Sequence, residues 1–223
     1  MSDIFQDTPY PLTKEGLWAE VRVPVPKGRP ALFLDRDGVV VEDSHYLNRP
    51  EDVSLMAGAA DVIAHANTMD IPVIIVTNQA GIAYGYFGWD SFALVQEKIL
   101  GEIQKATGGI VDAVFACPFH AKGKPPYQHP DPPCRKPNPG MIVEAARMMD
   151  IDLGRSWIVG DKDIDMRAGL NAGLAGGVHV ASGHGKDTGE REKALAVATG
   201  EFQVFGADDI QGAEGLIPFL KNS

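Results

Sequence analysis

The sequence has few cysteines, a deficit of basic residues and no long apolar run. Only two of its 223 residues are cysteines, Cys117 and Cys134, too few for a disulfide framework. Twenty lysines and arginines stand against 30 aspartates and glutamates, and the net charge of −10 argues against a nucleic-acid or anionic-membrane surface. No run approaches the roughly 18 apolar residues of a membrane span, and the polar N-terminus lacks a signal-peptide core. A soluble, cytoplasmic, monomeric protein is expected.

Segments with the apolar pattern of buried strands alternate along the chain with segments that have the apolar spacing of helices. Residues 1–30 are rich in proline and weakly patterned, and we interpret them as an N-terminal extension of a domain that covers residues 31–223. Within that domain we expect strands at 31–34, 71–78, 112–117, 156–161, 176–181 and near 202–205. Helices are expected at 57–69, 91–107, from 139 onward, 163–172 and 211–221. Alternating helices and fully buried strands predict a doubly wound, mainly parallel α/β sheet with helices on both faces.

Capping residues refine three of these boundaries. Asp90 is the expected N-cap of the helix at 91–107, and Gly108 and Gly109 are expected to end it. Asn138 is the expected cap of the next helix, with Pro139 at its first helical position. Residues 118–134, which contain many prolines, are expected to form a loop.

Polar residues follow the predicted strands in a consistent way. They are Asp35 and Asp37, Thr77 and Asn78, Lys136, and Asp161 and Asp165. Each has an ordinary explanation taken singly, as a helix cap, a turn residue or a solvated lysine. The carboxyl ends of parallel strands meet at one edge, however, and ligands bind there. The whole set is therefore expected to form one site.

The chemistry of this set favours phosphoryl transfer. Several carboxylates cannot stay ionised side by side without a cation, and oxygen ligands of this kind suit Mg²⁺. A carboxylate beside a lysine and a magnesium ion can attack a phosphoryl group, so Asp35 is the candidate nucleophile. Asp37 can move the proton. Thr77 and Lys136 can hold the transferring oxygens.

Four segments carry a family resemblance. They are "DRDGVV", "VIIVTNQAGIAYG", "CRKPNPGM" and "GDKDIDMRAG". These segments resemble the four motifs of the haloacid dehalogenase (HAD) superfamily of phosphatases. More narrowly, they resemble its branch of heptose-bisphosphate and histidinol-phosphate phosphatases. The resemblance covers about residues 31–180. It implies an HAD-like fold and a Mg²⁺-dependent phosphatase that forms a phospho-aspartyl intermediate. The short segments between the motifs leave no room for a large cap domain.

The resemblance also implies residue roles. Asp35 is the nucleophile, and Asp37 is first the general acid and then the base. Mg²⁺ is held by Asp35, the backbone carbonyl of Asp37 and Asp161, while Asp165 supports the metal site or orients Lys136. The implied substrate-binding residues are Asp43, Ser44, His45, Tyr46, Asn78, Gln79, Arg135 and Lys162. Arg135 suits a second phosphate. Plain surface charge remains the alternative for Arg135 and Lys162, and an ordinary turn for residues 43–46.

The cysteine- and histidine-containing loop leaves two interpretations open. Cys117, His120, His129 and Cys134 would supply two sulfur and two nitrogen ligands to a structural Zn²⁺ ion. Many members of the family carry a zinc loop at this place. Here, however, Phe119 and Pro132 occupy two of the usual ligand positions. The alternative is a loop stiffened by its prolines, with Cys117 buried.

The expected substrate is a small phosphorylated sugar. The first hypothesis, by resemblance, is removal of the 7-phosphate of D-glycero-D-manno-heptose 1,7-bisphosphate, in lipopolysaccharide biosynthesis or related carbohydrate metabolism. Histidinol phosphate is the alternative substrate, although Arg135 favours a second anion over an imidazolium. A nucleic-acid 3′-phosphatase is opposed by the acidic charge. A non-catalytic sugar-phosphate-binding protein is the alternative of another class, and it would not need the nucleophile.

Overall fold

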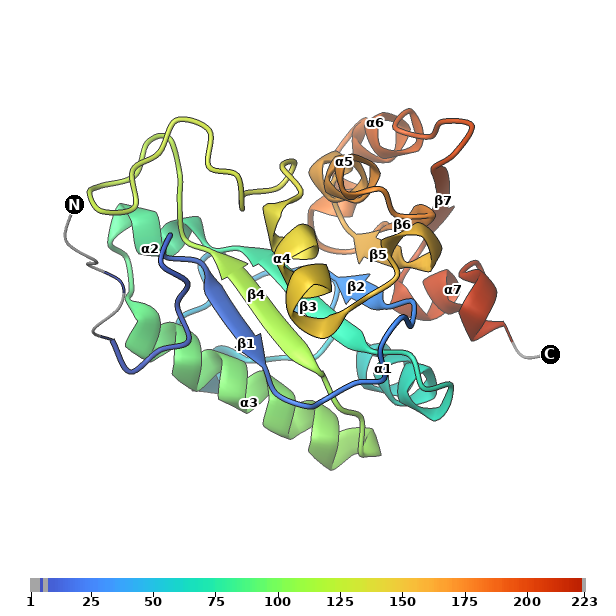
Figure 1. The fold of residues 1–223 in the computed structure, drawn as a ribbon, viewed down its shortest axis with the longest axis horizontal. Coiled ribbons are helices and arrows are strands. Elements are labelled where there is room, and N and C mark those ends of the chain that lie inside the picture. The colour runs from blue at the N-terminus through green and yellow to red at the C-terminus, as the bar shows by residue number, and fades with distance from the viewer. Residues whose placement is uncertain (1–4, 6–7, 222–223) are drawn as a thin grey trace.

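A seven-stranded sheet forms the centre of the molecule (Figure 1). The computed structural model describes residue 5 and residues 8–221. In spatial order the strands are β1 (Trp18–Val21), β4 (Ala113–Cys117), β3 (Val73–Asn78), β2 (Leu32–Leu34), β5 (Trp157–Gly160), β6 (Gly176–Val180) and β7 (Gln203–Ala207). All neighbouring pairs are parallel except β1 with β4. The predicted fold class, a mainly parallel α/β sheet, is confirmed.

Helices cover both faces of the sheet because alternate strand residues are apolar on both sides. Leu32, Leu34 and Ile75 pack on one face with helices α1 (Ala59–Thr68), α3 (Trp89–Thr107) and α7 (Ile210–Glu214). Phe33, Ile74 and Val76 pack on the opposite face with α4 (Gly140–Met149), α5 (Asp163–Ala172) and α6 (Glu190–Leu195). Successive strand side chains point to opposite faces, so each short strand anchors two cores.

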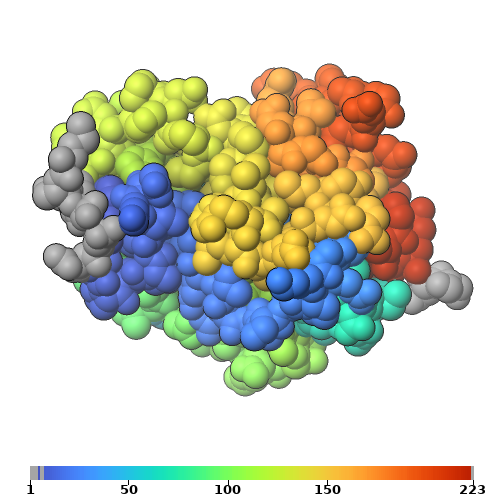
Figure 2. All heavy atoms as spheres, in the orientation of Figure 1, coloured from blue at the N-terminus to red at the C-terminus, as the bar shows by residue number. Residues whose placement is uncertain are grey.

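The remaining elements are short. They are α2 (Ala80–Tyr84) and the 3₁₀ turns η1 (Pro50–Asp52), η2 (Leu153–Arg155), η3 (Gly183–Lys186) and η4 (Pro218–Leu220). In the described part of the chain, the segments between β2 and α1 and between β3 and β4 contain only loops, η1, α2 and α3. The loop after β4 covers one end of the molecule, at the upper left of the space-filling view (Figure 2). No helix among the described residues is long and apolar enough to cross a membrane.

Three of the predicted helix boundaries are wrong. The N-cap of α3 is Gly88, and Asp90 lies in the first turn of that helix. Pro139 is the N-cap of α4, while the Asn138 side chain donates to Asp131 and to the Pro132 carbonyl. The helix expected over 211–221 ends at Glu214, and a 3₁₀ turn that begins at Pro218 follows it. Gly108 does end α3, with a φ of 77°.

The segment expected as an N-terminal extension contributes to the sheet. Strand β1 pairs antiparallel with β4, and the Trp18 ring packs at an angle against Trp89 and edge-to-face against Phe92 of α3. The weak pattern of residues 1–30 conceals this strand because it is a short edge strand in a segment rich in proline.

Candidate active site

The expected site lies where the direction of strand order reverses. Strand β2 has β3 on one side and β5 on the other, which creates a crevice beyond their carboxyl ends. Asp35 follows β2, Thr77 is the penultimate residue of β3, and Asp161 follows β5. Lys136 comes from the loop after β4, and Asp165 lies in the first turn of α5. The structure therefore brings the predicted catalytic and metal-binding residues together.

Lys136 is the centre of the buried charge cluster. Its ammonium Nζ lies 2.8 Å from Asp35 Oδ1, 2.6 Å from Asp165 Oδ1 and 2.9 Å from the Val76 carbonyl oxygen. These three acceptors match the three N–H donors of an ammonium. Burial by itself lowers the pKa of Lys136, but the carboxylates of Asp165 and Asp35 outweigh it and raise that pKa. The lysine is therefore held permanently charged.

The carboxylates outnumber the lysine. Asp35, Asp161 and Asp165 offer oxygen atoms that lie within 4.8 Å of one another. Burial and the nearby carboxylates raise the pKa of Asp35 to about 6 and that of Asp161 to about 8, although Lys136 opposes the rise at Asp35. When all three carboxyl groups are ionised, the single ammonium leaves two negative charges uncompensated. A divalent cation would remove this imbalance.

The local packing fits such a cation. Asp161 Oδ1 is buried with no hydrogen-bond partner, whereas its Oδ2 accepts a hydrogen bond from the His184 backbone amide at 2.8 Å. Gly38 has a φ of 87°, and a Cβ atom there would lie 2.5 Å from Asp161 Oδ2. Only glycine allows the turn after Asp37 to approach the carboxylate this closely. The unpartnered oxygen is the atom that a Mg²⁺ ion would take.

Asp37 is held apart from this cluster by other partners. Arg36 contacts both of its carboxylate oxygens, at 3.0 and 3.2 Å, and the Gln79 amide donates to Oδ2 at 3.0 Å. Arg36 is itself buried, with its guanidinium over the Phe92 ring. The Asp37 side chain remains 23% exposed, more than the other acidic residues of the site. It is thus the carboxylate that can exchange protons with a molecule in the crevice.

A cavity of about 450 Å³ opens over these residues. Most of the predicted site residues line it, namely Asp35, Asp37, Asp43, His45, Tyr46, Thr77, Asn78, Gln79, Arg135, Lys136 and Lys162. Ser44 does not line the cavity, although its neighbours do. Sequence reasoning missed Arg36, Tyr84, Ile164 and His184. The segment "SGHGKD" at 182–187 follows a predicted strand, so the strand-end rule applied to Asp35 would have found His184 as well.

Asn78 positions Lys136 by pairing with its backbone. Its amide nitrogen donates to the Lys136 carbonyl, and its carbonyl oxygen accepts from the Lys136 amide, both at 3.1 Å. Asn78 also lines the cavity, and its contact with substrate stays a prediction. Gln79 similarly joins Asp37 to Thr77.

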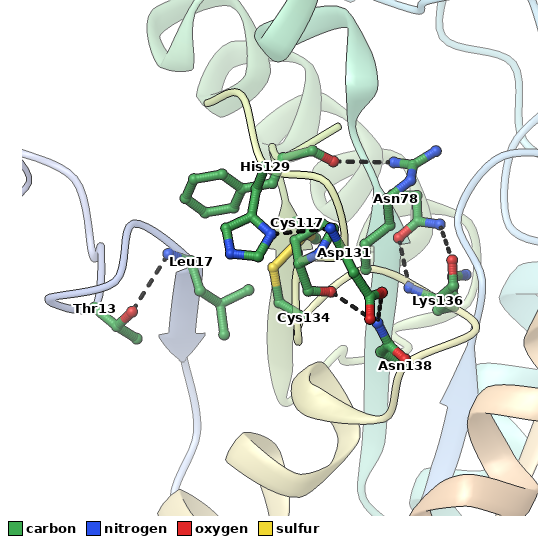
Figure 3. Close-up of a disulfide and its surroundings, with 12 residues drawn as sticks. Thr13, Leu17, Asn78, Cys117, His129, Asp131, Cys134, Lys136 and Asn138 are labelled. Atoms are coloured by element: carbon green, nitrogen blue, oxygen red, sulfur yellow. Dashed lines mark hydrogen bonds between the residues drawn. A yellow bond between two sulfur atoms is a disulfide. The ribbon is translucent and has the colours of Figure 1, made fainter. Parts of the chain in front are cut away.

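A disulfide secures the loop that carries Arg135 and Lys136 (Figure 3). Cys117, the last residue of β4, is bonded to Cys134, directly before Arg135. The zinc interpretation is therefore wrong for this structure, because both sulfur ligands are consumed by the bond. The proposed histidine ligands have other partners, since His120 Nδ1 accepts from the Lys122 amide and His129 Nδ1 accepts from the Asp131 amide.

Comparisons with known proteins agree with this geometry. Residues 133–205 match the family model described as HAD-hydrolase-like. A D-glycero-beta-D-manno-heptose-1,7-bisphosphate 7-phosphatase from Mesorhizobium japonicum is 51% identical over 76% of this chain and 79% of its own length. The chain belongs to the heptose-bisphosphate phosphatase branch of the HAD superfamily.

Solved structures extend this family assignment to the fold. A HAD-like phosphatase from Mesorhizobium loti has a TM-score of 0.83 and 42% identity, with 95% of this chain and 96% of that chain covered. The D,D-heptose 1,7-bisphosphate phosphatase of B. bronchiseptica, solved with magnesium and phosphate, has a TM-score of 0.67 and 32% identity. That comparison covers 82% of this chain and 95% of the other. Magnesium as the cofactor type is supported by this relative, which was solved with the ion, whereas these comparisons do not show zinc.

Proposed function

We propose that this protein is a Mg²⁺-dependent phosphatase that removes the 7-phosphate of D-glycero-D-manno-heptose 1,7-bisphosphate. The observation that carries the proposal is the buried cluster of Asp35, Lys136 and Asp165 beside the unpartnered oxygen of Asp161. A protein that only binds its ligand would not need a buried carboxylate nucleophile that is paired with a lysine. The heptose substrate is supported by the relatives, among them the heptose-1,7-bisphosphate 7-phosphatase that is 51% identical to this chain.

The first half of the reaction transfers the phosphoryl group to Asp35. Its Oδ1 is held by Lys136 and by the Arg36 backbone amide, which leaves Oδ2 for attack on phosphorus. A bond forms between Oδ2 and phosphorus while the bond to the sugar oxygen breaks. Asp37 gives its proton to that leaving oxygen, so that the sugar departs as a neutral alcohol.

The second half releases phosphate. Asp37, now a carboxylate, takes a proton from a water molecule, and the water oxygen attacks phosphorus. The bond between phosphorus and Asp35 breaks, and the free carboxylate is restored. Asp35 and Asp161 would hold the metal ion, which when bound neutralises charge on the transferring oxygens. The Thr77 hydroxyl holds those oxygens from the protein side, and the charge of the Lys136 ammonium, whose three N–H groups already have acceptors, stabilises them electrostatically.

The test of the mechanism is Asp35→Asn, which preserves shape and removes the nucleophile. We expect phosphate release to fall by at least about 10³-fold while the circular dichroism spectrum and melting temperature stay close to wild type. Asp163→Asn is the matched control, because Asp163 lies at the start of α5 and pairs with the exposed Arg167. Unchanged turnover in Asp35→Asn would remove the mechanism.

The test of the substrate is a panel of phosphate esters assayed for kcat/KM. It includes heptose 1,7-bisphosphate, heptose 7-phosphate, fructose 1,6-bisphosphate and histidinol phosphate. We expect the heptose bisphosphate to be preferred, because Arg135 and Lys162 line the cavity and offer charge to a second phosphate. A preference for histidinol phosphate would overturn the substrate but leave the mechanism standing.

A further inference from the structure

The segment after β6 packs directly against the nucleophile and metal loops. The Ser182 hydroxyl donates to the Gly38 carbonyl at 2.5 Å and is buried. Gly183 has a φ of 48°, and a Cβ atom there would lie 2.5 Å from Asp161 Oδ2 and 2.7 Å from Gly38 Cα. Three segments thus meet with no space between them, and the next residue, His184, emerges at the cavity.

His184 contacts both the metal-ligand loop and the loop after β2. Its backbone amide donates to Asp161 Oδ2 at 2.8 Å. Its ring Nε2 lies 3.1 Å from Asp43 Oδ2, and both residues line the cavity. Its Nδ1 lies 3.0 Å from Asp187 Oδ2, which orients the ring. One residue therefore connects the carboxylate of Asp161 to a second carboxylate that lines the cavity.

His184 contacts the Asp43 carboxylate from outside the loop that carries it. Asp43 Oδ1 accepts from the His45 amide at 3.0 Å within the same loop, and its Oδ2 pairs with His184. Among the described residues, the His184 contact is the only hydrogen bond or ion pair that ties residues 43–46 to another segment. His45 and Tyr46 have φ values of 53° and 61°, so the loop adopts a backbone that needs such support.

We infer that His184 is a positioning residue that determines selectivity for polyhydroxylated phosphate esters. It fixes Asp43 at a set distance from the phosphoryl site, so that the carboxylate accepts hydrogen bonds from sugar hydroxyls of the bound substrate. This inference rests on the proposed function, and it names the part of the substrate that the pair recognises. His184 itself does not touch the reacting atoms.

The test compares His184→Ala with wild type on two substrates. For heptose 1,7-bisphosphate we expect KM to rise roughly tenfold with kcat changed by less than about threefold, because the lost contact serves binding. For p-nitrophenyl phosphate, which has no sugar hydroxyls, neither constant should change by more than about twofold. Lys186→Ala, an exposed residue of the same 3₁₀ turn, is the matched control.

Two further variants separate positioning from general damage. His184→Gln retains a side-chain N–H that can reach Asp43, and we expect it to recover most of the KM. Asp43→Asn in the His184→Ala background should add little to the loss, because both changes disrupt the same contact. Independent, multiplying losses would overturn the inference, as would an equal fall in kcat on both substrates.

Failure of the inference is distinguishable from failure of the proposed function. If wild type does not hydrolyse the heptose bisphosphate, the proposed substrate is wrong. The variants are then compared on the sugar phosphate that wild type hydrolyses best. A KM loss confined to that sugar phosphate supports the role of His184, and identical losses on p-nitrophenyl phosphate overturn it.

Discussion

At the scale of single residues, the site depends on charge balance in a buried place. Lys136 is 3% exposed and pairs with two carboxylates. Loss of a charge from such a buried cluster lowers the free energy of unfolding more than loss of one from an exposed ion pair. Asp35 and Asp165 tolerate burial only because the lysine is present. Lys136 therefore stabilises the folded protein even when no substrate is bound.

We expect replacement of Lys136 to destabilise the protein. Lys136→Met, measured by urea unfolding in EDTA, should lower the free energy of unfolding by about 3 kcal/mol, because two buried carboxylates lose their partner. Adding Asp165→Asn should restore part of that loss. The control is Lys98→Met, which breaks an exposed pair with Glu102 at the same 2.6 Å separation and should cost about 0.5 kcal/mol or less. Equal losses in both variants would contradict the argument.

At the scale of elements, the loop after β4 decides where two cationic residues lie. The disulfide joins the end of β4 to the residue before Arg135, and Asn78 at the end of β3 pairs with the Lys136 backbone (Figure 3). Two neighbouring strands thus determine the path of one loop. Cytoplasmic thiols are usually kept reduced. The expected cytoplasmic location would therefore favour free cysteines, whereas the structure has Cys117 and Cys134 bonded.

The element-scale prediction concerns this bond. Cys117→Ser, or reduction of the wild type, should lower the free energy of unfolding by about 3 kcal/mol, since the bond closes a loop across a sequence separation of 17. KM for a bisphosphate should rise with it, because Arg135 is released. Titration of thiols in denatured, unreduced protein should find almost none, and metal analysis should find no zinc. Two free thiols with one bound zinc would reinstate the zinc interpretation.

At the scale of the whole molecule, the sheet joins two cores at the site. Strand β2 is only three residues long, yet its side chains reach both cores, and Asp35 follows immediately. Packing in both cores therefore helps to position Asp35. A ligand or metal ion that binds at the site is expected to stabilise the entire fold.

Magnesium binding gives the whole-molecule prediction. At a concentration about 100 times Kd, Mg²⁺ should raise the melting temperature by roughly 5–10 °C over EDTA-treated protein at matched ionic strength. Asp161→Asn should lose most of this shift, because it removes a buried ligand. An undiminished shift in that variant would place the ion elsewhere.

The sequence by itself determined the fold class, the positions of the main parallel strands along the chain and the set of polar residues that gather at their carboxyl ends. Strand periodicity and the strand-end rule suffice for Asp35, Thr77 and Asp161, because these residues follow directly from where a buried strand stops. Tertiary structure alone decided the place of β1, the pairing of Cys117 with Cys134 and the contact between His184 and Asp43. These features join segments that are far apart along the chain, such as Ser182 and Gly38 at a separation of 144 residues. The local sequence pattern does not predict such distant contacts, because they depend on the spatial order of the strands in the sheet.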